Sequence, residues 1–242
     1  MQAVILAGGE GTRLKPYTTV IPKPLMPLGN HAILEIILKQ LKEAGIKDVI
    51  VTLGYLGELI EAYLKTHDFF GMNLSLSYEK SPLGTAGPLT LIDNLEPDFL
   101  VMNGDILCNL DFGEMFEQHR TRENDITVAA YTKKVLIDLG VIETDQEKKV
   151  IDYIEKPTYS FLVSMGLYVI KKKAIEKLPK GQRLDLPELV LKAVSQKLKV
   201  RSYGFDGLWL DIGRMDDYSE AQEKLPEILR ELSLSELDAP PH

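Results

Sequence analysis

The sequence predicts an α/β fold: a single domain with a mixed, mainly parallel central sheet flanked by helices. Two observations lead to this prediction. Short apolar runs alternate with segments of helical periodicity through the first half of the chain, which is the pattern of parallel strands joined by helices. After about residue 125, further apolar runs follow with fewer helices between them, which indicates antiparallel or mixed additions to the sheet.

No boundary divides the chain. Its 242 residues contain no linker rich in glycine, proline or serine and no repeat of solenoid period. We therefore expect one domain over residues 1–242, with a first half to about residue 108 and a second half from about 109 to 232. The second half is expected to fold over the first.

In the first half the expected elements alternate in type. One helix is expected after Asn30, a residue type that caps helices, and it should end at Gly45. A second helix is expected over residues 56–64. The apolar runs that predict strands cover residues 3–7, 48–53, 73–78 and 99–102.

In the second half the strand patterns cover residues 126–131, 141–143, 150–154 and 163–170. Asp185 and Glu188 match a capping box with Pro187 in the first turn, so a helix should start there and run to about Ser195. A last helix is expected over about 215–232, and the tail from 233 to 242 is expected to be frayed.

The composition of the chain excludes several classes of partner and binding site. A formal charge of −8 gives the chain no overall attraction for nucleic acid, although small phosphates can still be bound locally. The single cysteine, Cys108, excludes an internal disulfide and a multi-cysteine zinc site. No apolar run approaches a membrane span, and the chain starts without a basic leader segment. We expect a cytoplasmic protein with no membrane or nucleic-acid partner.

A glycine loop follows the first predicted strand directly. Gly8, Gly9 and Gly11 let the backbone approach a ligand and present N–H groups to phosphate oxygens. Arg13 adds a planar fork that can grip two such oxygens. The spacing matches neither the dinucleotide-binding nor the P-loop fingerprint, so neither hydride transfer nor P-loop hydrolysis is predicted. The alternative is a glycine-rich turn beside a solvated arginine.

Two further motifs suit a phosphate ligand. Pro22 and Pro24 flank Lys23 and restrict the direction of its stem, which favours a fixed positive charge beside a triphosphate. Asp105 follows the fourth apolar run, at the strand edge where α/β proteins collect ligands, and its carboxylate suits a hard cation.

These motifs, Leu6 to Pro16 followed by Pro22-Lys23-Pro24-Leu25, resemble the signature of the sugar-1-phosphate nucleotidylyltransferases. The residues of these motifs are most similar to those of the mannose-1-phosphate guanylyltransferase-like branch, and the resemblance extends to about residue 220. It implies a Rossmann-like nucleotidyltransferase fold and a Mg²⁺-dependent reaction. In that reaction a sugar 1-phosphate, mannose 1-phosphate or a related sugar, joins a nucleoside triphosphate and releases pyrophosphate. A homo-oligomer is left open.

The resemblance also implies residue roles. Asp105 and Asp211 would hold the magnesium ion, Lys156 the sugar phosphate and Glu155 the sugar hydroxyls. Gly140 and Gly166 would lie against the sugar. Arg13, Lys23 and Lys156 would be the catalytic cations. The implied nucleotide-binding residues are Leu6, Ala7, Gly8, Gly9, Gly11, Thr12, Glu79, Gly84 and Thr85.

The base and the acceptor remain open at this point. Glu79 would meet the base, and an ionised carboxylate only accepts hydrogen bonds, which suits the adjacent N1–H and N2–H₂ donors of guanine. GTP therefore leads, CTP is second, and UTP or dTTP follow. Ser164 stands where many hexose-specific relatives have asparagine, so a heptose 1-phosphate or a phosphocholine-type acceptor is the alternative. A non-catalytic nucleotide-sugar-binding regulator is the third interpretation.

Overall fold

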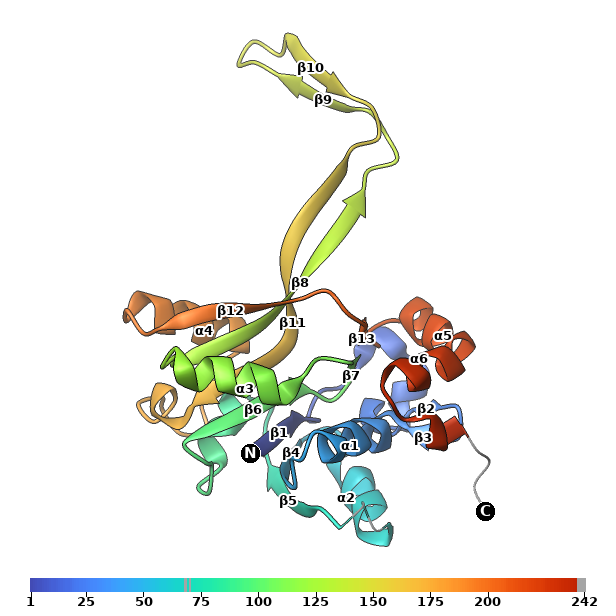
Figure 1. Cartoon of the computed structure of the whole chain (residues 1–242), viewed down its shortest axis with the longest axis vertical. Coiled ribbons are helices and arrows are strands. Elements are labelled where there is room, and N and C mark those ends of the chain that lie inside the picture. Colours follow the sequence, from blue (N-terminus) through green and yellow to red (C-terminus); the bar gives the residue numbers. More distant parts are fainter. Residues whose placement is uncertain (68, 70, 239–242) are drawn as a thin grey trace.

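The computed structural model describes residues 1–67, 69 and 71–238. Within them, seven strands form a central sheet in the order β12-β8-β11-β6-β1-β4-β5 (Figure 1). Only β11 runs against the others, so the predicted α/β fold with a mixed, mainly parallel sheet is confirmed. The strands are β1 (Gln2–Leu6), β4 (Asp48–Leu53), β5 (Asn73–Tyr78), β6 (Asp98–Asn103), β8 (Ile126–Leu136), β11 (Thr158–Lys171) and β12 (Val200–Phe205).

Smaller elements complete the fold. Three two-stranded sheets are β2 (Pro27–Leu28) with β3 (His31–Ala32), β7 (Ile106–Cys108) with β13 (Trp209–Asp211), and β9 (Val141–Thr144) with β10 (Val150–Ile154). The α-helices are α1 (Ile33–Glu43), α2 (Gly57–Thr66), α3 (Phe112–Thr121), α4 (Leu186–Ser195), α5 (Met215–Glu223) and α6 (Leu225–Glu231). No helix in the described part of the chain has the length and apolar character needed to cross a membrane.

Alternating side chains of the central sheet pack into two apolar cores, one on each face of the sheet. Ala3 and Ile5 point into the larger core, which contains side chains of α1, α2, α3 and the C-terminal helices. Val4 points to the other face, where it packs with residues of α4 and of the 3₁₀ helix Gly87–Leu91. Both faces of the sheet are thus covered, as a parallel sheet requires.

Helix α1 shows where local pattern and tertiary context disagree. Its buried residues recur every three or four positions, as predicted, and Gly45 follows its end with a φ of 77°. The helix nevertheless begins after Ala32, and Asn30 does not cap it. The pairing of β3 with β2 holds His31 and Ala32 extended, so the helix cannot begin earlier.

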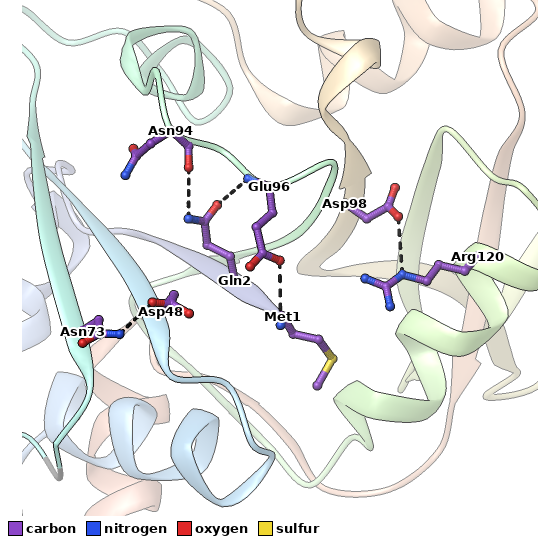
Figure 2. Close-up of polar contacts among 8 residues, drawn as sticks. All are labelled: Met1, Gln2, Asp48, Asn73, Asn94, Glu96, Asp98 and Arg120. Carbon is purple, nitrogen blue, oxygen red and sulfur yellow. Dashed lines mark hydrogen bonds and ion pairs between the residues drawn. The ribbon is translucent and has the colours of Figure 1, made fainter.

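Polar contacts tie together the amino ends of the central strands (Figure 2). Gln2 donates from Nε2 to the Asn94 carbonyl (3.2 Å) and accepts from the Glu96 N–H (2.9 Å). Asn73 at the start of β5 donates to Asp48 at the start of β4 (2.9 Å). These bonds anchor the end of the sheet opposite to the carboxyl edge, where parallel sheets bind ligands.

The C-terminal region corrects two expectations. The predicted single helix over about 215–232 is two helices, broken at Lys224, because Pro226 lacks the N–H that a continuous helix would need. The tail is not frayed through residue 238: Leu234 is fully buried and Ser235–Asp238 forms a 3₁₀ helix. Residues 239–242 lie outside the described residues. The capping box at Asp185 and Glu188 is confirmed.

Strands β8 and β11 are longer than predicted and project from the body as a two-stranded arm, with the β9–β10 hairpin at its tip (Figure 1). We define the arm as residues 132–162. Tyr131 and Val163 pair at its base, where β12 also ends against β8. Strand β12 was not predicted, since Ser202 and Gly204 interrupt its apolar pattern.

Candidate active site

The parallel strands bring separate loops to one edge of the sheet. Leu6, at the end of β1, is in register with Thr52 of β4 on one side and Asn103 of β6 on the other. The loops that follow these strands therefore start side by side. They are joined by backbone bonds such as that from Tyr55 N to Gly8 O (3.1 Å).

A cleft of about 660 Å³ opens at this edge, and we call it the first cleft. The segments that reach it include the glycine loop after β1, the segments after β4 and β5, and the turn after β6. The residues that the sequence singled out and that line this cleft are Leu6, Ala7, Gly8, Gly9, Gly11, Thr12, Arg13, Lys23, Glu79, Gly84, Thr85 and Asp105.

Close backbone packing explains the glycines at the floor of the first cleft. A Cβ on Gly54 would lie 2.6 Å from the Glu79 Oε1 and 2.7 Å from the Gly8 carbonyl oxygen. A Cβ on Gly8 would also collide with the Glu79 carboxylate. The absence of side chains at both positions lets the loop lie flat against Glu79 and exposes its backbone to the cleft.

Glu79 is held in place at the end of β5. Its Oε2 accepts from the Leu83 N–H at 2.9 Å, and its side chain is partly buried. Burial raises the pKa of the Glu79 carboxyl, and the Leu83 hydrogen bond partly offsets that rise. The carboxylate is thus a fixed acceptor on the wall of the first cleft.

Lys23, in the 3₁₀ helix Lys23–Leu25, and Asp105, in the turn after β6, form an ion pair through Nζ and Oδ2. Their side chains are only 10% and 15% exposed, so the pair is strongly shielded from water. The other carboxylate oxygen, Asp105 Oδ1, is buried without a hydrogen-bond partner in the described structure. A buried carboxylate oxygen without a hydrogen-bond partner is stabilised when it binds a cation.

Asp211 reaches the same place from the second half of the chain. Pairing of β13 with β7 sets Asp211 opposite Ile106, and Ile212 N donates to the Asp105 carbonyl (3.0 Å). Burial raises the pKa of Asp211, and the charge of Asp105 raises it further. Arg13 is a close neighbour: a Cβ on Gly213 would lie 2.9 Å from Asp211 Oδ1 and 3.1 Å from Arg13 Nη2.

These residues fit a magnesium ion. Among the described residues, no group of three or more His, Cys, Asp or Glu side chains could hold a metal ion. Mg²⁺, however, usually takes one or two carboxylates and completes its shell with water and substrate phosphates. Asp105, with its unpartnered oxygen, and Asp211, destabilised as an anion by burial and by Asp105, supply that kind of half-site.

A second cleft of about 440 Å³ adjoins the first, sharing Thr85 and Asn103 with it. Its lining is largely neutral or aromatic, and its charged members are acidic. The residues are Thr85, Asn103, Ile106, Ser164, Met165, Gly166, Tyr168, Asp185, Leu186, Pro187, Trp209 and Asp211. Asp105 lines the first cleft and Asp211 lines the second, so the two carboxylates mark the place where the clefts adjoin.

The wall of the second cleft forms at an irregularity of β11. The pairing register with β8 shifts between Ser164 and Tyr168, and Gly166 adopts a φ of 73° there. A Cβ on Gly166 would lie 2.6 Å from Asn103 Nδ2, so the position requires glycine. The Ser164 hydroxyl lies 3.0 Å from the Tyr168 hydroxyl, and Trp209 Nε1 donates to the Met165 carbonyl at 3.2 Å.

The loop at Gly84 and Thr85 is fixed by the start of α4. Thr85 N donates to Asp185 Oδ1 (3.0 Å), and Leu186 N donates to the Thr85 hydroxyl (2.7 Å). Gly84 has a φ of 75°, and a Cβ there would lie 2.5 Å from Asp185 Oδ1. The α4 capping residue thus also positions the wall between the clefts.

Three predicted sugar-site residues line neither cleft. Gly140, Glu155 and Lys156 lie on the arm instead. Lys156 pairs with Asp138 at 2.7 Å, and its side chain is 55% exposed. Its backbone adopts a φ of 44°, an uncommon conformation for lysine that sits where the arm turns into its terminal hairpin.

Sequence reasoning missed several lining residues. Tyr55 and Gly54 follow β4 at the same sheet edge, and that position was the available signal. Arg183 reaches the first cleft from the second half of the chain, and no local pattern marks it. Tyr168 and Trp209 add aromatic surface to the second cleft; Trp209, two residues before Asp211, could have been noticed as the chain's single tryptophan.

Residues 2–228 match the family model described as nucleotidyl transferase. The chain belongs to this family. The resemblance drawn from the glycine loop and Lys23 is thereby confirmed. Its mixed sheet, with the matched motifs at one edge, is the nucleotidyl transferase fold that the resemblance implied.

Relatives of this nucleotidyl transferase differ in nucleotide and sugar. A UTP–glucose-1-phosphate uridylyltransferase of Synechocystis sp. is 32% identical over 91% of this chain and 62% of its own length. A mannose-1-phosphate guanyltransferase of Yarrowia lipolytica is 33% identical over 95% of this chain and 67% of its own length. The chain thus spans 62% to 67% of the length of these curated relatives.

A solved structure is similar over nearly the whole chain. HddC from Yersinia pseudotuberculosis, complexed with GMP-PN, matches this nucleotidyl transferase with a TM-score of 0.70 at 26% identity. The match covers 93% of this chain and 99% of HddC.

Proposed function

We propose that this nucleotidyl transferase joins a sugar 1-phosphate to a nucleoside triphosphate, with GTP favoured, and releases pyrophosphate. One observation carries the proposal: the glycine loop, Arg13 and the Lys23–Asp105 pair converge on one cleft with Glu79 on its wall. A phosphate cradle, fixed cations and an acceptor for a base are the parts that a nucleotide needs.

The triphosphate would lie along the glycine loop. Residues Gly8 to Thr12 line the first cleft, where their N–H groups would bind phosphate oxygens, and the exposed Arg13 would bind the β- and γ-phosphates. Lys23 is held close to Asp105, so its charge is in position before negative charge develops at the α-phosphate. A magnesium ion held by Asp105 and Asp211 would act as a Lewis acid on phosphoryl oxygens.

No general base is needed. The second pKa of a phosphate monoester is about 6, so the acceptor phosphate is already largely dianionic at neutral pH. The protein's task is to bring two anions together in line and to stabilise the leaving pyrophosphate. We assign the orientation of the acceptor phosphate to Lys156 and contacts with the sugar to Glu155, Gly140 and Gly166.

Guanine is the favoured base because of Glu79. An ionised carboxylate has four acceptor sites, and the Leu83 N–H uses only one of them. The carboxylate can therefore accept from both N1–H and N2–H₂ of guanine, whereas uracil offers one donor between two acceptors. The Yarrowia relative named as a guanyltransferase and the complex of HddC with GMP-PN support this choice. The Synechocystis uridylyltransferase makes UTP the competing candidate.

The division of labour follows the order of the chain. We assign nucleotide binding to the half up to about residue 108 and acceptor binding to the half from about 109 to 232. We assign a mannose-like acceptor to the second cleft, which Ser164, Gly166 and two aromatic side chains line. A heptose 1-phosphate and phosphocholine remain the alternative acceptors. The cytoplasmic location stays a prediction.

The test is pyrophosphate release from a grid of four nucleoside triphosphates against mannose, glucose and heptose 1-phosphates and phosphocholine, with Mg²⁺ and with excess chelator. Release that requires GTP, one sugar phosphate and the metal supports the proposal. Release with UTP alone would contradict the assignment of guanine as the base that Glu79 binds. Binding of nucleotides without any release would favour a regulator.

A further inference from the structure

The arm leaves a large apolar surface exposed. Nine large hydrophobic side chains on it are at least 39% exposed: Val135, Leu136, Leu139, Ile142, Val150, Ile151, Tyr153, Phe161 and Leu162. An isolated two-stranded ribbon is marginally stable in water, and exposed apolar side chains in this number favour an interaction site. The arm therefore needs a cover.

One face of the arm, which we call the inner face, carries Tyr159, Phe161 and Val163 along β11 and Val135 and Tyr131 along β8, with Lys133 between the last two. The pairing register sets Val135 opposite Tyr159 and Lys133 opposite Phe161, and side chains two residues apart share a face. Tyr159 and Phe161 lie in ring contact, with centroids 6.4 Å apart. At the base this face ends on Tyr131 and Val163.

This inner face leads into the second cleft. The ring centroid of Tyr131 lies 5.3 Å from that of Trp209, which lines the cleft. A partner that covers the inner face therefore also reaches the mouth of the second cleft. The charged residues lining that cleft are Asp185 and Asp211, both acidic, so within the described structure it lacks the cation that a phosphate acceptor requires.

The cation assigned to that task, Lys156, lies within the arm, between the outer end of the β8–β11 ladder and the terminal hairpin. The ladder runs from Val163 at the base to Thr158, and at about 3.4 Å per residue it spans roughly 17 Å, with Lys156 two residues further on. Strand β8 runs unbroken from Ile126 to Leu136. Folding the arm back over its own cleft would break that ladder, whereas packing against a second copy keeps every pair.

We propose that two copies of the chain pair through the inner faces of their arms and that each arm delivers Lys156 to the second cleft of the other copy. A twofold interface uses the same patch on both subunits, so two antiparallel ladders can place the outer end of each, where Lys156 lies, beside the base of the other. The partner's Lys156 then reaches a cleft that holds only acidic charges. This inference rests on the proposed role of Lys156 in binding the acceptor phosphate.

The oligomeric state gives the first test, measured by light scattering on the full chain. Wild type is expected to be a dimer, and Phe161→Glu a folded monomer, since Phe161 is 53% exposed and does not support the body. Leu191→Glu, at a leucine on α4 outside the arm that is 69% exposed, should remain dimeric. A monomeric wild type, or a dimer unaffected by Phe161→Glu, would overturn the proposal.

Mixed dimers test the delivery of Lys156. Arg13→Ala and Lys156→Ala are each expected to be inactive at low acceptor concentration. After the two are mixed and allowed to exchange, random pairing gives hybrid dimers with one complete site, restoring about a quarter of wild-type turnover. The double variant mixed with Lys156→Ala should restore nothing. Absence of recovery from dimers that do exchange places Lys156 in its own subunit and refutes delivery to the partner.

An intersubunit crosslink tests the pairing of the arms independently of the proposed activity. Subunits carrying Lys156→Cys, mixed with subunits carrying Ser164→Cys, should form an intersubunit disulfide under mild oxidation. The native Cys108 is buried and does not compete. A crosslink together with a wild-type dimer that transfers no nucleotide would support the arm pairing and refute the proposed activity. A crosslink only within a doubly substituted chain would overturn the arm pairing.

Discussion

Asp211 lies beside Asp105 because β13 pairs with β7. The register sets Asp211 opposite Ile106, and the Ile212 N–H donates to the Asp105 carbonyl at 3.0 Å. Two carboxylates distant in sequence thus share a partly desolvated position, where burial and mutual repulsion raise the pKa of Asp211. Carboxylates in such an arrangement are stabilised by a divalent cation.

Asp105→Asn should nearly abolish turnover. It removes the proposed metal ligand and the negative partner of Lys23, and loss of comparable electrostatic stabilisation costs about 10²–10³-fold in kcat. The measurement is pyrophosphate release at saturating substrates and varied Mg²⁺. Asp206→Asn, at an exposed aspartate outside both clefts, should keep wild-type turnover. Near-normal activity of Asp105→Asn would remove Asp105 from the metal site.

Gly54→Ala should disturb the floor of the first cleft. The new Cβ would lie 2.7 Å from the Gly8 carbonyl oxygen and 2.6 Å from Glu79 Oε1, so the loop and the carboxylate must shift. Overpacking costs about 1–3 kcal/mol, which lowers Tm by about 2–4 °C per kcal/mol in a chain of this length.

The KM for the nucleotide should rise together with the fall in Tm. Gly204→Ala is the control, because a Cβ there meets nothing within 4 Å. Equal Tm and KM values for the two variants would show that the close approach at Gly54 has no role.

The fold and the first cleft could be predicted from sequence because local pattern determines both. Glycines directly after a buried strand, and Asp105 directly after another, mark loops that parallel strands carry to a common edge. The second cleft could not be predicted in the same way. Its wall depends on a register shift between Ser164 and Tyr168, and its aromatic surface on Trp209, which arrives through long-range pairing.

The arm shows the limit of pattern analysis most clearly. The sequence predicts strands at 126–131 and 163–170 but does not indicate that their pairing continues away from the body. Lys156, assigned to the sugar site by resemblance, consequently lies outside both clefts of its own chain. The break in the last helix was readable from Pro226, which sits at the start of α6.

Glu79→Gln should change the preferred base. The amide replaces one acceptor oxygen with a donor, which suits the acceptor–donor–acceptor edge of uracil better than the paired donors of guanine. The ratio of kcat/KM for GTP to that for UTP should fall by about tenfold or more, since one hydrogen bond to a charged group contributes about 1.5–3 kcal/mol. An unchanged ratio would mean that Glu79 does not contact the base.

The same variant has a pH signature in stability. The pKa of Glu79 is raised in the folded state, chiefly by burial, so ionisation of this group destabilises the fold as pH rises through that raised value. Glu79→Gln avoids the ionisation. The difference between the Tm of Glu79→Gln and that of wild type should therefore increase from pH 4 to pH 7. A constant difference in Tm over that range would argue against a raised pKa.

Lys156→Ala should act mainly on the acceptor. Loss of a charged hydrogen bond of about 1.5–3 kcal/mol predicts a rise of about 10–100-fold in KM for the sugar phosphate, with little change in KM for the nucleotide. Lys134→Ala, at an exposed lysine on the opposite face of the arm, should leave both constants unchanged. An unaltered acceptor KM in Lys156→Ala would exclude Lys156 from phosphate binding.

The most direct measurement of the central claim is ³¹P NMR of the full chain with GTP, mannose 1-phosphate and Mg²⁺. Transfer predicts two coupled signals of a new pyrophosphate diester, appearing in equal amount with inorganic pyrophosphate, and their loss when chelator is added. Formation of GDP and orthophosphate would show hydrolysis at the γ-phosphate and contradict the mechanism. Unchanged spectra with every nucleotide and acceptor of the grid would contradict transfer altogether.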